Sequence, residues 1–171
     1  LKTAEDNAVQ LQIVAATVKV NDERKRAMAD RIIAACGGSV DGKTIGILGL
    51  TFKPNTDDMR DAPSLVIIPA LQAAGAKVKA FDPEGMRAAA ALLPSVEMSS
   101  DAYAAIEGAD AAVLLTEWNE FRALDWQRIK KELQSPLFVD LRNVYPVEEI
   151  SLHKIDYISV GRRGLTHNYG F

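Results

Sequence analysis

The side chains best suited to chemistry lie in one loop, within the stretch GILGLTFKPNTDDMRDAPS that runs from Gly46 to Ser64. Lys53 and Arg60 are permanent cations that follow an apolar segment, and such groups bind phosphate oxygens. The ring of Phe52 could lie against the face of a nucleobase. The loop also carries three carboxylates that would orient the cations and reduce the positive charge of the empty site: Asp57, Asp58 and Asp61. These residue types together indicate a site for a phosphorylated ligand that carries a base.

A second interpretation of the same loop needs no ligand. Clusters of opposite charges are common on protein surfaces and contribute little to stability, so the loop could be a salt-bridged surface segment. Pro54 and Pro63 would stiffen it in either case. Pro63 also suits the first turn of a following helix, with Ala62 or Asp61 as the cap. The residues alone leave both interpretations open.

A dinucleotide-binding fingerprint is not expected in this loop. Gly46 and Gly49 are present, but the third glycine and the tight turn of that motif are absent. Residues 51–63 separate the strand from the next helix, where the motif demands an immediate turn. Asp82 lies 33 positions beyond Gly49, whereas the acidic residue that binds a ribose lies about 20 positions on. The sequence therefore argues against an ordinary NAD cradle.

Further polar residues stand where the other predicted strands end. In an open α/β sheet, ligands bind outside the carboxyl ends of the strands. The residues at these ends are Asp82, Thr116, Glu117, Asp140 and Arg142. Any sheet of this type shows some such residues, so the pattern locates a ligand edge without identifying the ligand.

The elements that must position these residues form an α/β pattern from residue 42 onward. Four apolar runs are typical of strands buried on both faces, as parallel strands are: TIGILGL, KVKAF, AAVLLT and LFVDL. Two weaker strands are expected around Val96 and at YISV, and the segments between the strands have helical compositions. This alternation predicts an α/β fold with a doubly wound, Rossmann-like parallel sheet and helices on both faces.

One long helix is predicted ahead of the sheet, from Thr3 to Cys36, with a stop at Gly37 and Gly38. Apolar residues recur at helical spacing: Leu11, Val14, Val18, Met28 and Ile32. The intervening positions of this register are Asn21 and Lys25, within the polar run NDERKR. Such a helix would be about 50 Å long, too long to lie on one small sheet. We therefore expect residues 1–38 to form a connector that meets another domain or subunit, rather than only a helix with a solvated middle, and residues 39–171 to form the α/β domain.

Composition excludes several classes of function. The chain has 171 residues, a net charge of −3 and a pI near 5.4, which does not favour nucleic-acid binding. No apolar run approaches the roughly 20 residues that cross a membrane, and no signal peptide opens the chain. The single cysteine, Cys36, fits a cytoplasmic protein without disulfides, and we expect it to be buried and inert. His153 and His167 lack metal-ligand spacing, so no metal is expected.

Four motifs give the sequence a resemblance to a known family: GLTFKPNTDDMRDAPS, AFDP, LLTEWNEF and DLRN. Together with VNDERKR, they are similar to the C-terminal domain of the UDP-glucose/GDP-mannose dehydrogenases, and the resemblance covers nearly the whole chain. It implies that Phe52 and Lys53 contact the uridine portion of a UDP-sugar and that Arg142 helps to bind the nucleotide-sugar. It implies that Arg60 reaches an NAD bound mainly by another domain. The long helix would link the two domains and form much of a homodimer interface.

The resemblance also implies a reaction, in which the C6 alcohol of UDP-glucose is oxidised to a carboxylate while two NAD⁺ are reduced. That chemistry requires a cysteine thiolate from a glycine-rich motif, which this chain lacks. The chain starts at Leu1 rather than Met, and we expect a fragment without catalytic residues that is inactive alone. Two alternatives stay open: another sugar substrate, GDP-mannose or UDP-N-acetylmannosamine, and a non-catalytic interaction module.

Overall fold

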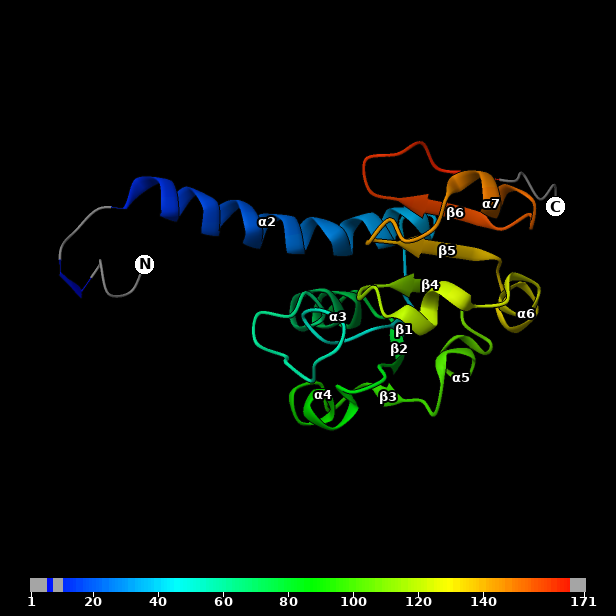
Figure 1. Cartoon of the computed structure of the whole chain (residues 1–171), viewed down its shortest axis with the longest axis horizontal. Coiled ribbons are helices and arrows are strands. Elements are labelled where there is room, and N and C mark those ends of the chain that lie inside the picture. Colours follow the sequence, from blue (N-terminus) through cyan, green and yellow to red (C-terminus); the bar gives the residue numbers. More distant parts are fainter. Residues whose placement is uncertain (1–5, 8–10, 167–171) are drawn as a thin grey trace.

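A six-stranded, all-parallel sheet forms the centre of the molecule (Figure 1). The structure, a computed structural model, describes residues 6–7 and 11–166. The strand order is β3-β2-β1-β4-β5-β6, so the chain runs outward from β1 to one edge, returns, and continues from β4 to the other edge. This arrangement confirms the doubly wound α/β fold that the sequence predicts.

The strands occupy the predicted apolar runs, including the two weaker ones. Their bounds are Thr44–Leu48 for β1, Lys77–Phe81 for β2, Glu97–Met98 for β3, Ala111–Leu114 for β4, Leu137–Asp140 for β5 and Asp156–Ser159 for β6. β4 is buried at all four positions, which explains its continuous apolar sequence.

The helices fill the predicted connections, with two additions. Their bounds are Gln12–Ala35 for α2, Ser64–Ala73 for α3, Met86–Leu92 for α4, Ala102–Ile106 for α5, Trp126–Glu132 for α6 and Val147–Ser151 for α7, with a 3₁₀ turn, η1, at Asn119–Ala123. The sequence did not predict η1 and α7, because five residues are too few to show a helical period. The expected cap of α3 at Ala62 or Asp61 is wrong: Pro63 occupies that position and carries no side-chain cap.

The long helix α2 confirms the prediction from Gln12 to Ala35, but the predicted start is too early, because the described Asn7 lies in a turn and Leu11 is the N-cap. It ends at Ala35, and Gly37 and Gly38 follow with φ angles of 86° and 90°, which favour glycine. The predicted residues 3–5 and 8–10 lie outside the described part of the chain. The second half of α2 lies against α3 and β5, while its first half extends beyond the sheet (Figure 1).

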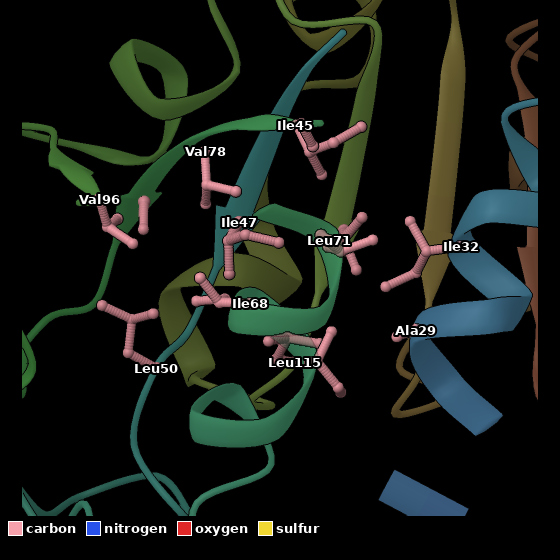
Figure 2. Packing of buried hydrophobic residues seen from close by; sticks show 14 of the residues in the cluster. Ala29, Ile32, Ile45, Ile47, Leu50, Ile68, Leu71, Val78, Val96 and Leu115 are labelled. Carbon is pink, nitrogen blue, oxygen red and sulfur yellow. The ribbon is translucent and has the colours of Figure 1, made fainter. Parts of the chain in front are cut away.

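Two hydrophobic clusters cover the two faces of the sheet. Because side chains alternate along a strand, Ile47 and Val113 point to one cluster, while Leu48 and Leu114 point to the other. Helices α2, α3 and α4 cover the first face, and α5, α6 and α7 cover the second. In Figure 2, the α2 residues Ala29 and Ile32 lie across from Leu71 of α3, so the base of the long helix is part of the core.

Gly46 allows the second layer of helices to approach the sheet. A Cβ atom at this position would lie 2.6 Å from the carbonyl oxygen of Ala105 in α5 and 3.0 Å from Cα of Ile106. A side chain here would therefore push α5 away from β1. Among the helices of the described residues, none is long and apolar enough to cross a membrane.

Candidate functional site

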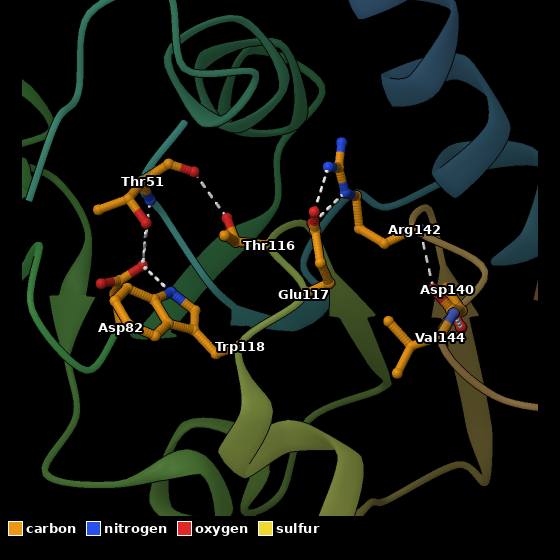
Figure 3. A network of polar contacts seen from close by, with 8 residues as sticks. All are labelled: Thr51, Asp82, Thr116, Glu117, Trp118, Asp140, Arg142 and Val144. Carbon is orange, nitrogen blue, oxygen red and sulfur yellow. Dashed lines mark hydrogen bonds and ion pairs between the residues drawn. The ribbon is translucent and has the colours of Figure 1, made fainter. Parts of the chain in front are cut away.

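A buried carboxylate organises the carboxyl edge of the sheet. Asp82 directly follows β2, and its side chain is fully buried. Its Oδ2 accepts hydrogen bonds from the backbone N–H groups of Leu50 and Thr51, at 2.7 and 3.0 Å. The Thr51 hydroxyl donates to the same oxygen at 3.0 Å, and so does Nε1 of Trp118 at 3.1 Å (Figure 3). Asp82 therefore joins the ends of β1, β2 and β4.

The second oxygen of Asp82 is also occupied by the protein. Oδ1 accepts from the backbone N–H groups of Gly85 and Glu84, at 2.7 and 3.1 Å. Burial alone would raise the pKa of the Asp82 carboxyl, but backbone N–H donors outweigh burial and hold this pKa below its usual value. A ribose hydroxyl would have to displace one of these donors, which agrees with the absence of an NAD cradle at this position.

The loop after β1 is folded by its own polar groups. The backbone N–H of Phe52 donates to the carbonyl of Asp58 at 2.9 Å. The guanidinium of Arg60 donates to both carboxylate oxygens of Asp58, at 2.9 and 2.7 Å. These hydrogen bonds lower the pKa of Asp58 to about 2. The hydroxyl of Thr116 donates to the carbonyl of Thr51 at 2.7 Å, which ties the start of the loop to the end of β4. Salt bridging in the loop is thus confirmed for one pair.

Arg142 is held on the same edge by a second set of contacts. Its Nε donates to Oε2 of Glu117, and its Nη2 donates to Oε1 at 2.7 Å (Figure 3). Burial of Glu117 would raise the pKa of its carboxyl, but the bonds from Arg142 bring this pKa below the usual value. The backbone N–H of Arg142 donates to Oδ1 of the buried Asp140 at 2.8 Å.

These elements enclose a cavity of about 610 Å³, within the range that binds small ligands. Its lining includes Phe52 from the β1 loop, Arg142 from the β5 loop, and residues of α2. The structure thus brings two of the four predicted site residues together. Lys53 and Arg60 are exposed and are not among the described residues that line this cavity.

The α2 wall of the cavity is a feature that the sequence analysis missed. Four residues of the polar run lie in it: Asn21, Asp22, Arg24 and Lys25. Asn21 and Lys25 occupy the inward register of the helix, and polar residues at inward positions are a signal that could have identified this wall. Lys25 pairs with Asp22 at 3.9 Å and is largely shielded from solvent. Arg31 anchors the helix further along by donating to the backbone carbonyl of Ser159.

Among the described residues, no cysteine, serine, threonine or histidine lines the cavity. Cys36 is buried in the core, as predicted, and burial raises the pKa of its thiol, which disfavours the thiolate. In the part of the chain that the structure describes, no group of three His, Cys, Asp or Glu side chains could hold a metal ion. His153 lies against the ring of Trp126, and His167 falls outside the described residues.

The fold and the site define a doubly wound α/β domain with a cavity at the carboxyl ends of its strands, where such sheets bind ligands, and the lining of this cavity is largely apolar with a few charged side chains of both signs. Residues 46–147 match the model of the UDP-glucose/GDP-mannose dehydrogenase family, UDP binding domain. The chain belongs to this family. The match covers both loops that carry the predicted residues, and it confirms the resemblance seen in the sequence.

Relatives agree with the family match. The chain is 52% identical over 162 residues to a UDP-glucose 6-dehydrogenase from Rhizobium meliloti and 39% identical over 163 residues to UDP-glucose 6-dehydrogenase TuaD from Bacillus subtilis. Each alignment covers 95% of this chain but only 37% and 35% of those relatives. Among solved structures, an NDP-N-acetyl-D-galactosaminuronic acid dehydrogenase from Methanosarcina mazei superposes with a TM-score of 0.82 at 27% identity, covering 99% of this chain and 37% of that one. A UDP-glucose dehydrogenase from Pyrobaculum islandicum superposes with a TM-score of 0.73 at 28% identity, and the alignment covers 94% of this chain and 34% of that one.

Proposed function

We propose that this chain is the UDP-sugar-binding part of a UDP-glucose 6-dehydrogenase. The observation that carries the proposal is the cavity that joins Phe52 to Arg142 within a chain whose residues 46–147 match a UDP binding domain. The 52% identity to the Rhizobium meliloti enzyme favours UDP-glucose over other nucleotide-sugars.

The cavity offers groups for each part of such a ligand. Phe52 is 48% exposed, so its ring face is available to a uracil base. Arg142 supplies a planar fork of donors that matches phosphate oxygens. Lys53 is exposed beside Phe52, and its flexible side chain would reach the ribose or the phosphates from the rim. Lys25 and Arg24 of α2 add positive charge to the lining, which Asp22 partly offsets.

In the complete protein we assign the redox chemistry to other parts of the polypeptide. The relatives are nearly three times as long as the aligned segment, and NAD would be bound mainly by their remaining residues. The guanidinium of Arg60 is 89% exposed and is not part of the cavity lining, and it would contact that cofactor. This chain alone would bind UDP-glucose without oxidising it, since Cys36 is buried with a raised pKa.

Isothermal titration of the chain with UDP tests the proposal. We expect measurable binding, a Kd about tenfold higher for Arg142→Ala, and a smaller increase for Lys53→Ala. Arg87→Ala is the matched control, because Arg87 is an exposed cation on α4 outside the cavity lining. Binding of equal strength in all four proteins would remove Arg142 and Lys53 from the site. Absence of binding by the unsubstituted chain would favour a non-catalytic interaction module instead.

A different nucleotide-sugar is the second candidate, since one structural neighbour is an NDP-N-acetyl-D-galactosaminuronic acid dehydrogenase. Competition of UDP against GDP in the same titration separates a UDP-sugar enzyme from a GDP-mannose enzyme. Preference for GDP would overturn the assignment to UDP-glucose while leaving the cavity as the binding site.

We also propose that α2 mediates a homodimer. Its first half exposes Ile13 and Val20, which are seven positions apart and form an apolar row on one side, while Val14 and Val18 are exposed on the other side. Contiguous exposed apolar residues on a helix are typical of protein interfaces. Val18 lines the cavity from the same stretch of α2, so the interface and the site would share one helix.

A further inference from the structure

The ion pair between Glu117 and Arg142 joins two loops of the ligand edge. Glu117 follows β4, Arg142 follows β5, and the two residues are 25 positions apart. Both carboxylate oxygens accept from the guanidinium, through its Nε and Nη2. The side chains are 27% and 35% exposed, so the pair is partly shielded from water. A two-point contact of this kind fixes both the position and the plane of a guanidinium.

The backbone of Arg142 is fixed independently of Glu117. Its N–H donates to Asp140, a carboxylate that is fully buried. The next residue, Asn143, has a φ of 56° and exchanges two hydrogen bonds with the backbone of Val160, each of 3.0 Å. With the backbone held on both sides, the main remaining freedom of Arg142 is its long side chain. Glu117 removes that freedom.

The pairing leaves donors for a ligand. A guanidinium carries five N–H groups, and Glu117 uses two of them. In Figure 3 the remaining nitrogen of Arg142 points away from Glu117. Arg142 lines the cavity and Glu117 does not, so the arginine stands between the carboxylate and the space where a ligand would lie.

We propose that Glu117 is a positioning residue that aims Arg142 into the cavity for contact with the diphosphate of a UDP-sugar. This inference rests on the proposed function. Without Glu117, binding would have to immobilise a flexible arginine side chain, which costs affinity. Glu117 is also a negative charge near the site, and removing it would strengthen attraction for phosphate. The two effects change the affinity for UDP in opposite directions. A rise or a fall in Kd when Glu117 is replaced therefore identifies the effect that dominates.

The test is a double-mutant cycle with UDP titrations on Glu117→Gln, Arg142→Ala and the double variant. We expect Glu117→Gln to raise the Kd about three- to tenfold in the native background and by less than about twofold when Arg142 is absent. Glu132→Gln is the matched control, because Glu132 pairs with Arg128 on α6 and its side chain is 26% exposed. Unchanged thermal unfolding and near-ultraviolet circular dichroism would confirm that each variant folds.

Three outcomes would overturn the inference. Unchanged binding by Glu117→Gln would show that its hold on Arg142 adds nothing to the affinity, and tighter binding would show that its charge dominates. An equal loss in both backgrounds would show that Glu117 acts without Arg142. If the unsubstituted chain ignores UDP, this inference and the proposed function both fail, whereas native binding with an unaffected Glu117→Gln rejects this inference alone.

Discussion

Asp82 and Trp118, which are 36 positions apart in the sequence, meet in a buried hydrogen bond of 3.1 Å from the indole Nε1–H to Oδ2. The bond joins the end of β2 to the segment that follows β4. Since the same oxygen accepts from Leu50 and Thr51, the chain enters the ligand loop at a fixed point, one residue before Phe52. The carboxylate therefore sets the geometry of the loop without facing the cavity lining.

This relationship predicts that Asp82→Ala is strongly destabilising. The substitution leaves buried backbone, hydroxyl and indole donors without an acceptor, and we expect the free energy of unfolding to fall by about 3–5 kcal/mol. Urea denaturation measures the change. Asp101→Ala is the control, because Asp101 caps α5 by accepting from two backbone N–H groups in an exposed setting. Its loss should cost about 1 kcal/mol. Equal losses of unfolding free energy in the two variants would show that the burial of Asp82 does not increase its contribution to stability.

The lowered pKa of Asp82 predicts a pH dependence of stability. A carboxyl whose pKa is lower in the folded state stabilises the fold above its unfolded value of 3.8, and this contribution is lost as the pH falls through the folded value. The free-energy difference between the native chain and Asp82→Asn should therefore be larger at about pH 6 than at about pH 3. Urea denaturation at the two pH values measures it. A difference that grows on acidification would contradict the ionised, hydrogen-bonded carboxylate.

The fold was predictable because its signals are local. A parallel strand buried on both faces, such as β4, needs a continuous apolar run, and the chain provides one for β1, β4 and β5. The expectation that KVKAF is buried on both faces is wrong, because Lys77 of β2 is exposed and Lys79 is half-buried. The ligand edge followed from the same reasoning, since polar residues such as Asp82 and Arg142 directly follow strands. The stop of α2 was equally local, because Gly37 and Gly38 take φ angles that favour glycine.

The internal geometry of the site was not predictable because its contacts are long-range. Asp58 pairs with Arg60 only two positions away, which composition could suggest. The pairing of Glu117 with Arg142 depends instead on β4 and β5 lying side by side in the sheet. Likewise, α2 lines the cavity only because its base packs on α3, and nothing in the polar run itself identifies that neighbour.

The α2 wall gives a third prediction, that Lys25→Ala weakens UDP binding. Lys25 lines the cavity and its ion pair with Asp22, at 3.9 Å, is loose enough to be exchanged for phosphate. We expect a Kd about threefold higher by titration, since one rim cation contributes modestly. Lys19→Ala is the matched control on the same helix, where Lys19 pairs with Glu23 at 3.8 Å but is 76% exposed and absent from the lining. Equal effects of the two substitutions would remove α2 from the site.

The exposed apolar row of α2 gives the last prediction. Ile13 and Val20 are 84% and 57% exposed, and a spacing of seven residues places them on the same side of the helix. If this row forms a homodimer interface, light scattering should give a mass near twice the 18.6 kDa of the chain at micromolar concentration. The double substitution Ile13→Asp and Val20→Asp should then shift the protein to the monomer, because two buried, unpaired carboxylates per helix would oppose association.

Lys19→Ala again serves as the control, since it changes an exposed charge on α2 without touching the apolar row. The core-facing residues Ala29 and Ile32 lie further along the helix, so the monomer should keep the thermal unfolding of the α/β domain and its affinity for UDP. A monomeric native chain, or a dimer that survives both aspartates, would show that this row is not the interface. Loss of UDP binding together with the dimer would instead mean that the second subunit completes the cavity.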